Sequence, residues 1–333
     1  MSINYRPDNT FIFSFVRMNP PTPGHLVLIR MMIDKAMKLG VNKVYVITSS
    51  SLDGKNPVPC SSETIPLPKK NRQDNRVLER LSQRDLIYKS AVLEKMIQSY
   101  KQEMIQSEPD ISKKTLLENL NIIVLCSRGS PFGFIYNIVK THYIDVGVPK
   151  INMIFFVGRD RADFLDTVVD TFRIKDYVNS VDGEILTREG MEEAKNTDVS
   201  EVNIEELNKK ENLSKYSGSL VRNLVKKGDR TKFQQVYSQY LPEEDIHKLY
   251  ETIQIGTQMS VPKKLEEHEN TRSVYFDGKL LPVINKSSDD IIDESVFKRQ
   301  RLNESSGGKK RNTRKISKTR KTRKNRRKYS TRK

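Results

Sequence analysis

An arginine, a hydroxyl and a histidine lie close together near the start of the chain, a combination suited to holding phosphate. Arg17 is followed by Thr22, Gly24 and His25. Thr22 can cap a helix that begins at Pro23, because the first helical position needs no N–H. Helix N-termini attract anions, and Gly24 has no side chain to keep a ligand from the backbone. The segment predicts a phosphate site. The alternative is an ordinary strand-to-helix connection with a surface histidine.

A second candidate anion site begins at Ser217. Ser217 or Ser219 can cap the helix that continues to Gly228. Arg222 lies one turn inside this helix, and its planar guanidinium can donate two parallel hydrogen bonds to a phosphate. A plain capped helix with a solvated arginine is the competing interpretation.

The elements around these residues alternate between strands and helices. Apolar, β-favouring runs predict strands at residues 11–16, 43–49, 121–126 and 151–157, with a weaker β pattern at 177–186. Helical patterns cover residues 23–39, 75–104, 132–143, 161–172 and 216–250. The alternation predicts an α/β fold with a Rossmann-like parallel sheet and helices on both faces. Ligands of such folds bind at the carboxyl ends of the strands.

Positive charge is concentrated at the end of the chain. The 333 residues carry a net charge of +17, and residues 309–333 hold 15 Lys or Arg and no acid, leaving +2 (17 less 15) for residues 1–308. We expect one domain over residues 1–257, a polar linker at 258–308 with a short β piece at 273–276, and a disordered basic tail at 309–333. Such a tail binds nucleic acid without sequence specificity, directs nuclear import, or only aids solubility.

The composition argues against several other classes of protein. Two cysteines, Cys60 and Cys126, are too few for a disulfide framework or a four-cysteine zinc site, and the four histidines follow no metal-ligand spacing. There is no signal sequence, and no apolar run approaches the ~20 residues of a membrane span. We expect a soluble protein of a reducing compartment, cytoplasmic or nuclear, that does not bind membranes.

The first motif resembles a known signature. Residues 22–25 (Thr-Pro-Gly-His) resemble the T-x-G-H form of the HIGH motif of the cytidylyltransferase-like nucleotidyltransferase superfamily, and Asn19 and Pro20 resemble the N-P in front of it. Residues 216–222 resemble the I-S-S/G-T-x-x-R signature that closes the active site there, with Tyr216 in place of Ile and Ser219 in place of Thr. The resemblance covers about residues 10–253.

Two further loops carry weaker likenesses. Residues 50–57 are similar to the S-x-D-x-K-N-P loop of phage and viral members, which implies that Lys55 lies near a substrate phosphate; a solvated turn lysine is the alternative. Gly158 and Asp160 are similar to the G-x-D that contacts the nucleotide after the fourth strand, and Asp160 also suits a helix cap. Adenylyltransferase-like members of phages and large DNA viruses are nearest in appearance, which points weakly to a virion-associated protein.

The resemblance implies nucleotidyl transfer, in which an acceptor phosphate attacks the α-phosphorus of a nucleoside triphosphate and pyrophosphate leaves. ATP is preferred over CTP, and Mg²⁺ accompanies the triphosphate rather than a carboxylate cage. The acceptor is a phosphorylated small molecule. The implied catalytic residues are His25, Thr22 and Arg222. The implied nucleotide-binding residues are Arg17, Asn19, Gly24, Gly158, Asp160, Ser217, Gly218 and Ser219, and Lys55 is the implied substrate-binding residue.

Competing enzymes lack their motifs here. No G-x-x-x-x-G-K-[ST] of a P-loop kinase occurs, and no K-M-S-K-S of a class I aminoacyl-tRNA synthetase. The remaining alternative is a nucleic-acid-binding protein on a catalytically inactive nucleotidyltransferase scaffold, acting through its basic tail.

Overall fold

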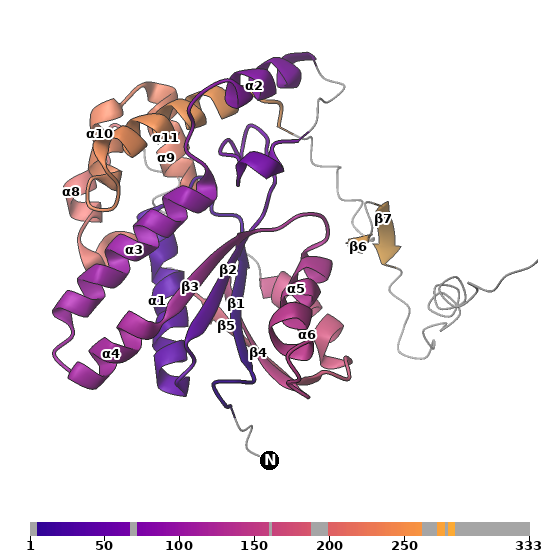
Figure 1. Cartoon of the computed structure of the whole chain (residues 1–333). Helices are drawn as coiled ribbons and strands as arrows, with labels where there is room; N and C mark the ends of the chain where they lie inside the picture. The colour runs from indigo at the N-terminus through magenta and orange to yellow at the C-terminus, as the bar shows by residue number, and fades with distance from the viewer. Residues whose placement is uncertain are drawn as a thin grey trace, which may run out of the picture. The chain divides into compact units, whose positions relative to one another are not determined.

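A parallel sheet of five strands, in the order β3-β2-β1-β4-β5, forms the centre of the fold (Figure 1). In this computed structural model, the described residues are 5–66, 72–159, 162–187, 199–261, 272–276 and 279–283, the last two ranges by their backbone alone. The strands are β1 (Thr10–Val16), β2 (Lys43–Thr48), β3 (Asn121–Cys126), β4 (Ile151–Gly158) and β5 (Val178–Leu186). The predicted α/β class with a Rossmann-like sheet is confirmed, including its weakest strand.

Each face of the sheet is covered by helices. Phe11 and Phe13 of β1 pack in the cluster that contains α5 (Pro131–Val139) and α6 (Ala162–Arg173). Ile12 and Val16 pack with α1 (Pro23–Leu39) and α3 (Lys89–Ser107) on the other face (Figure 1). Successive side chains of a strand point to opposite faces, so a sheet covered on both sides needs apolar residues at nearly every position. This double burial explains why the central strands β1, β2 and β4 are nearly continuous apolar runs in the sequence.

The first helix begins and ends where its caps predict. The helices before β4 are α1 (Pro23–Leu39), α2 (Arg72–Ser82), α3 (Lys89–Ser107), α4 (Ile111–Asn119) and α5 (Pro131–Val139), with the short helical turns η1 (Ser62–Thr64) and η2 (Lys140–Ile144). Gly40 ends α1 in the left-handed conformation with φ 69°, which glycine adopts without a steric penalty.

The single helix predicted over residues 75–104 is wrong. The structure has α2 and α3 there, separated by six residues, and it adds α4, which the sequence analysis did not predict. Leu86 and Ile87 lie between the two helices and are both buried, but in different clusters. The six residues between the helices thus bring neighbouring side chains into two separate clusters, a tertiary requirement that the helical pattern of the sequence does not show.

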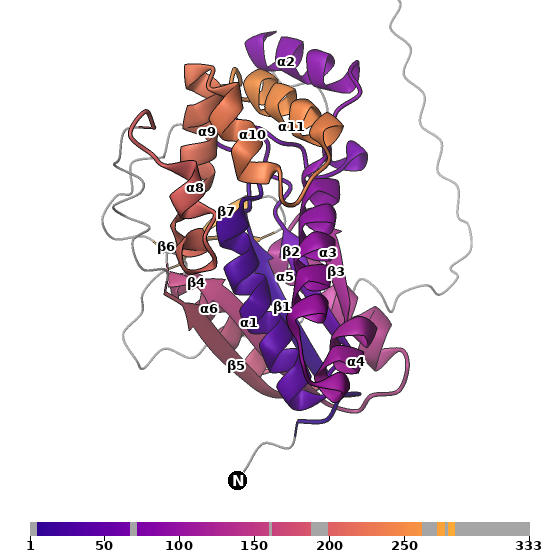
Figure 2. The ribbon, with the colours of Figure 1, turned by 90° about the vertical axis from the view of Figure 1, so that its left-hand side faces the viewer.

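The helix after β4, α6 (Ala162–Arg173), packs with α5 on one face of the sheet. The later helices form a layer of their own beside α1 and α3. They are α8 (Ile204–Leu207), η4 (Lys210–Lys215), α9 (Gly218–Lys227), α10 (Arg230–Tyr237) and α11 (Glu243–Gly256). The helical pattern predicted over residues 216–250 is thus three helices. In Figures 1 and 2, α11 lies beside α2, where the backbone N–H of Ser260 donates to Asp74 at 2.8 Å. A hairpin of β6 (Arg272–Phe276) and β7 (Lys279–Val283) includes the predicted β piece.

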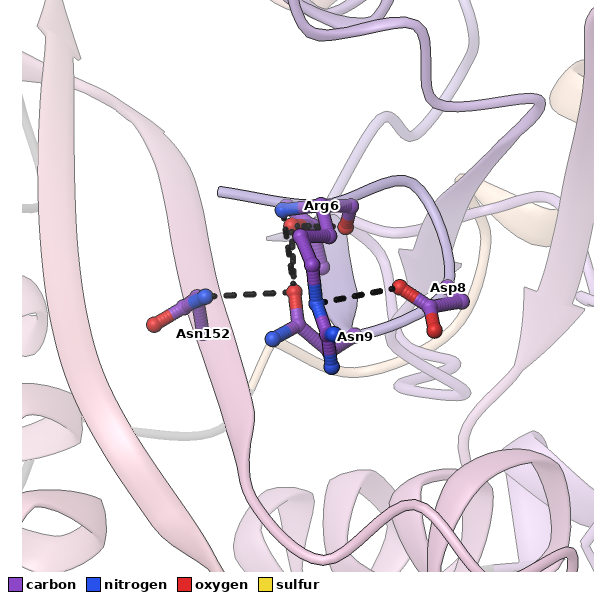
Figure 3. A network of polar contacts seen from close by, with 5 residues as sticks. Arg6, Asp8, Asn9 and Asn152 are labelled. Atoms are coloured by element: carbon purple, nitrogen blue, oxygen red, sulfur yellow. Dashed lines mark hydrogen bonds and ion pairs between the residues drawn. The ribbon is translucent and has the colours of Figure 1, made fainter. Parts of the chain in front are cut away.

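A polar network fixes the start of β1 at the amino edge of the sheet (Figure 3). The side-chain oxygen of Asn9 accepts from the backbone N–H of Arg6 at 3.1 Å and from the amide of Asn152 at 3.3 Å. Arg6 also pairs with Asp8 at 3.6 Å, and Asn152 on β4 is fully buried. These contacts join the segment before β1 to strand β4, at the edge opposite the end of β1 that precedes the first motif.

The two cysteines form a disulfide bond. Cys60 follows the loop after β2, and Cys126 is the last residue of β3. Disulfides rarely persist in reducing compartments, so the pairing counts against the reducing compartment expected from the sequence. In the part of the chain that the structure describes, no helix is long and apolar enough to cross a membrane.

Candidate functional site

The turn between β1 and α1 is held by side chains from three distant parts of the chain. Each side chain donates to a different backbone carbonyl of the turn, and the accepting carbonyls belong to every second residue. The pairs are Lys89 Nζ to Arg17 (3.0 Å), Arg222 Nη1 to Asn19 (2.7 Å) and Tyr237 Oη to Pro21 (2.6 Å). Each bond directs a carbonyl oxygen, which repels anions, toward a side chain of the protein itself. The turn is therefore organised before any ligand binds.

His25 is oriented by the residue that caps its helix. The backbone N–H of Thr22 donates to Nδ1 of His25 at 2.9 Å, and the Thr22 hydroxyl oxygen lies 3.0 Å from the same nitrogen. Because Nδ1 accepts a backbone N–H, the neutral ring carries its proton on Nε2. That tautomer is the one that donates through Nε2 to a phosphate oxygen. Thr22 is fully buried, so its hydroxyl acts on the histidine.

The second motif packs directly on the first. Ser217 caps α9 by accepting from the backbone N–H of Leu220 at 3.1 Å. A Cβ atom on Gly218 would lie 3.2 Å from the carbonyl oxygen of Asn19, so glycine allows the two backbones to approach. Arg222 donates through Nη2 to the Ser219 hydroxyl at 2.9 Å as well as to Asn19. The solvated arginine of the competing interpretation is therefore not what the structure has.

Two arginines bring like charge to this region. Burial lowers the pKa of the Arg222 guanidinium, the positive charge of Arg17 lowers that pKa further, and the carboxylate of Asp53 opposes both effects. Arg17 is exposed, whereas Arg222 is half-buried. Two cations that repel each other are stabilised by an anion placed within reach of both, so this electrostatic arrangement suits a polyphosphate.

The Asn19 side chain binds the loop after β2. Its amide donates to the carbonyl of Val58 at 2.8 Å, and its side-chain oxygen accepts from the backbone N–H of Val58 at 3.0 Å. In the same loop, the Asp53 carboxylate accepts the backbone N–H of Lys55 at 2.7 Å. The Lys55 side chain is exposed and forms no ion pair with the described residues. Asn19 thus joins two loops, while Lys55 extends outward from the second.

A cavity of about 570 Å³ opens at the carboxyl edge, and the sequence analysis did not identify it. Its wall combines hydroxyls, two aromatic rings, one cation and one acid: Phe15, Arg17, Ser49, Ser50, Ser51, Ser127, Gly129, Pro131, Asp163 and Phe164. The side-chain oxygens of Ser49 and Ser50 are buried and have no hydrogen-bond partner among the described residues. Buried polar atoms without partners are uncommon in proteins, which suggests a polar ligand. The run of three serines after β2 was the available sequence signal.

The predicted residues divide into those brought together and those that are not. His25, Thr22, Gly24, Asn19, Arg222, Ser217, Gly218 and Ser219 belong to the two motif segments that meet, and Arg17 joins them to the cavity. Gly158 ends β4 beside Leu186 of β5 and is not among the described residues that line the cavity. Asp160 lies outside the described residues.

Metal-ligating side chains do not gather within the described ranges, where no group of three His, Cys, Asp or Glu residues could hold a metal ion.

The fold and the site together define an α/β protein with a Rossmann-like parallel sheet whose carboxyl edge carries two joined polar motifs. No protein-family model, no curated protein and no solved structure matches the chain.

Proposed function

We propose that this protein is a nucleotidyltransferase that transfers AMP from ATP to a phosphorylated small molecule and releases pyrophosphate. One observation carries the proposal: the two segments that resemble the superfamily's signatures lie 203 residues apart in the chain, yet are joined by the bond from Arg222 to the Asn19 carbonyl. Gly218 lets the same two segments touch. A chance likeness in two separate motifs gives no reason for such contact.

The reaction forms a bond between an acceptor phosphate oxygen and the α-phosphorus, and breaks the bond from that phosphorus to the bridging oxygen of pyrophosphate. An anionic acceptor needs no nucleophile from the protein, so catalysis consists of positioning and charge stabilisation. His25 donates from Nε2 to a phosphate oxygen as charge develops. Arg222 and Arg17 hold the β- and γ-phosphates, with Ser219 beside them. Mg²⁺ enters as part of the substrate, bound to the triphosphate.

The cavity beside Arg17 is the candidate acceptor site. Its volume of about 570 Å³ falls in the usual range for small-molecule sites, about 300–1,000 Å³. The unpartnered hydroxyls of Ser49 and Ser50 suit a hydroxylated or phosphorylated acceptor. Lys55, on the neighbouring loop, is the candidate cation for the acceptor phosphate.

Binding of ATP with Mg²⁺ by the full chain is the first test, followed by pyrophosphate release with a panel of phosphorylated acceptors. Arg222→Ala is expected to abolish both. The matched control is Arg30→Ala, because Arg30 lies on α1 and pairs with Asp34 at 2.9 Å on an exposed surface. Equal ATP affinity in the wild type and Arg222→Ala would refute the assignment of the site.

The alternative is a nucleic-acid-binding protein that uses the scaffold only as support. The 15 basic residues of 309–333 favour it, because such a segment binds polyanions with a steep dependence on salt. A chain that binds single-stranded DNA through this segment but does not bind ATP would have this function.

A further inference from the structure

Lys89 is a fully buried lysine at the first position of α3. Its backbone N–H donates to the carbonyl of Pro59 at 2.9 Å, which fixes the start of the helix behind the loop after β2. The ammonium group donates to the carbonyl oxygens of Arg17 and Ser49. These two residues come directly after β1 and β2, and both line the cavity.

The two hydrogen bonds of the Lys89 ammonium lie where the pairing of β1 with β2 ends. The pairing of β1 with β2 runs to Val16 opposite Thr48, and the last backbone bond between them joins the Ser49 N–H to the Val16 carbonyl at 2.9 Å. Beyond it the chain after β1 turns into α1, while the chain after β2 forms a separate loop. The Lys89 ammonium bridges the next carbonyl on each side. The Lys89 side chain therefore links the two segments just beyond the point where their backbone hydrogen bonds end.

We propose that Lys89 is a positioning residue for anion binding, which acts by holding the ends of β1 and β2 at the separation that places the Arg17 guanidinium and the Ser49 hydroxyl in one cavity. Lys89 does not touch the ligand itself, since its side chain is fully buried; it acts on the cavity through the backbone of Arg17 and Ser49. This inference rests on the proposed function in one respect: the anion is a polyphosphate held by Arg17.

A double-mutant cycle tests the proposal, with inorganic pyrophosphate and ATP as probes and affinity measured by calorimetry on the full chain. Lys89→Met keeps the length of the side chain and removes its donors. Lys89→Met and Arg17→Ala are each expected to weaken binding about 10- to 100-fold, the contribution of one hydrogen bond to a charged group. The double variant is expected to lose less affinity than the sum of the two single losses, because Lys89 acts in part by positioning Arg17.

The control cycle pairs Lys89→Met with Arg30→Ala, which should combine additively. A purely structural role for Lys89 predicts the opposite pattern, in which its loss of affinity adds fully to that of Arg17→Ala. That additive result would overturn the proposal. Lys89→Gln, which keeps a donor on a shorter neutral side chain, enters the same cycle if Lys89→Met does not fold, and failure of both to fold would assign Lys89 to folding and overturn the proposal too.

The two hypotheses fail in different ways. If the wild type binds neither probe, the proposed function is wrong, and the positioning role is refuted with it. If the wild type binds pyrophosphate and ATP but the Lys89 and Arg17 effects add, the proposed function stands and only the role of Lys89 is lost.

Discussion

Reduction of the Cys60–Cys126 disulfide is expected to remove about 4 kcal/mol of folding stability. The bond closes a loop of 66 residues. In the chain-entropy treatment, closing a loop of that length lowers the entropy of the unfolded chain by about 15 cal/mol/K, or about 4 kcal/mol at 25 °C. The free energy of unfolding of a typical domain is only about 5–15 kcal/mol, so the loss would be a large fraction of the total stability.

The folded state should nevertheless keep its structure when the bond is reduced, because other contacts hold both cysteines. The carbonyl of Cys60 accepts from the backbone N–H of Ser90 at 3.1 Å and from its hydroxyl at 2.9 Å. Cys126 lies in the β2–β3 ladder opposite Thr48, whose hydroxyl oxygen is 2.8 Å from the Cys60 sulfur. The effect is therefore expected on the unfolded chain.

Urea unfolding of the oxidised and reduced full chain, followed by circular dichroism, measures the difference. Thiol titration of the denatured protein confirms the redox state of each sample. The oxidised protein should have the higher midpoint and the smaller slope of free energy against urea, since a cross-linked unfolded chain exposes less surface. Cys60→Ala/Cys126→Ala is the control, and reductant should not change it. Identical midpoints for the oxidised and reduced wild type would refute the entropic argument.

Three other variants probe the site and the amino edge. His25→Ala is expected to lower kcat by about 100- to 1,000-fold in pyrophosphate release, the usual effect of losing one preorganised donor, and an unchanged rate would remove the residue from the mechanism. Gly218→Ala is expected to weaken ATP binding several-fold, because the new Cβ would lie 3.1 Å from a guanidinium nitrogen of Arg222 and 3.2 Å from the carbonyl oxygen of Asn19. Gly133→Ala is the control and should bind ATP normally, because no atom lies nearer than 4.0 Å to its Cβ. Burial, with a nearby carboxylate, raises the pKa of Tyr5 to about 12. The unfolded chain then loses this proton near pH 10 and the folded chain does not, so stability should fall between pH 10 and 12, and by less in Tyr5→Phe, when urea midpoints are compared.

The sheet was predictable because its signals are local. Strands buried on both faces must be apolar at nearly every position, so β1 to β4 could be located to within a residue or two at either end. The bounds of α1 followed from Thr22, Pro23 and Gly40, whose effects on helix ends depend on the backbone of their own segment. The break between α2 and α3 was missed because it depends on two tertiary clusters, which the helical period of residues 75–104 does not reveal.

The site was predictable only in its motif segments. The residues that hold the turn, Lys89 and Tyr237, lie 72 and 216 positions from their partners, and nothing in their local sequence marks them. The pairing of Cys60 with Cys126 also depends on residues far apart in the chain, since it follows from the β2–β3 register that sets Cys126 opposite Thr48. Contacts of this kind depend on the order of the strands, which the alternation of elements leaves open.

The charges at the turn suit a site that binds an anion. Arg17 and Arg222 repel each other, and burial opposes the charge of Arg222; both effects destabilise the folded chain when no anion is bound. Arg222 is nonetheless held at the turn by its bonds to Asn19 and Ser219. An anion bound within reach of both arginines would relieve their repulsion, which is the electrostatic support for the proposed function.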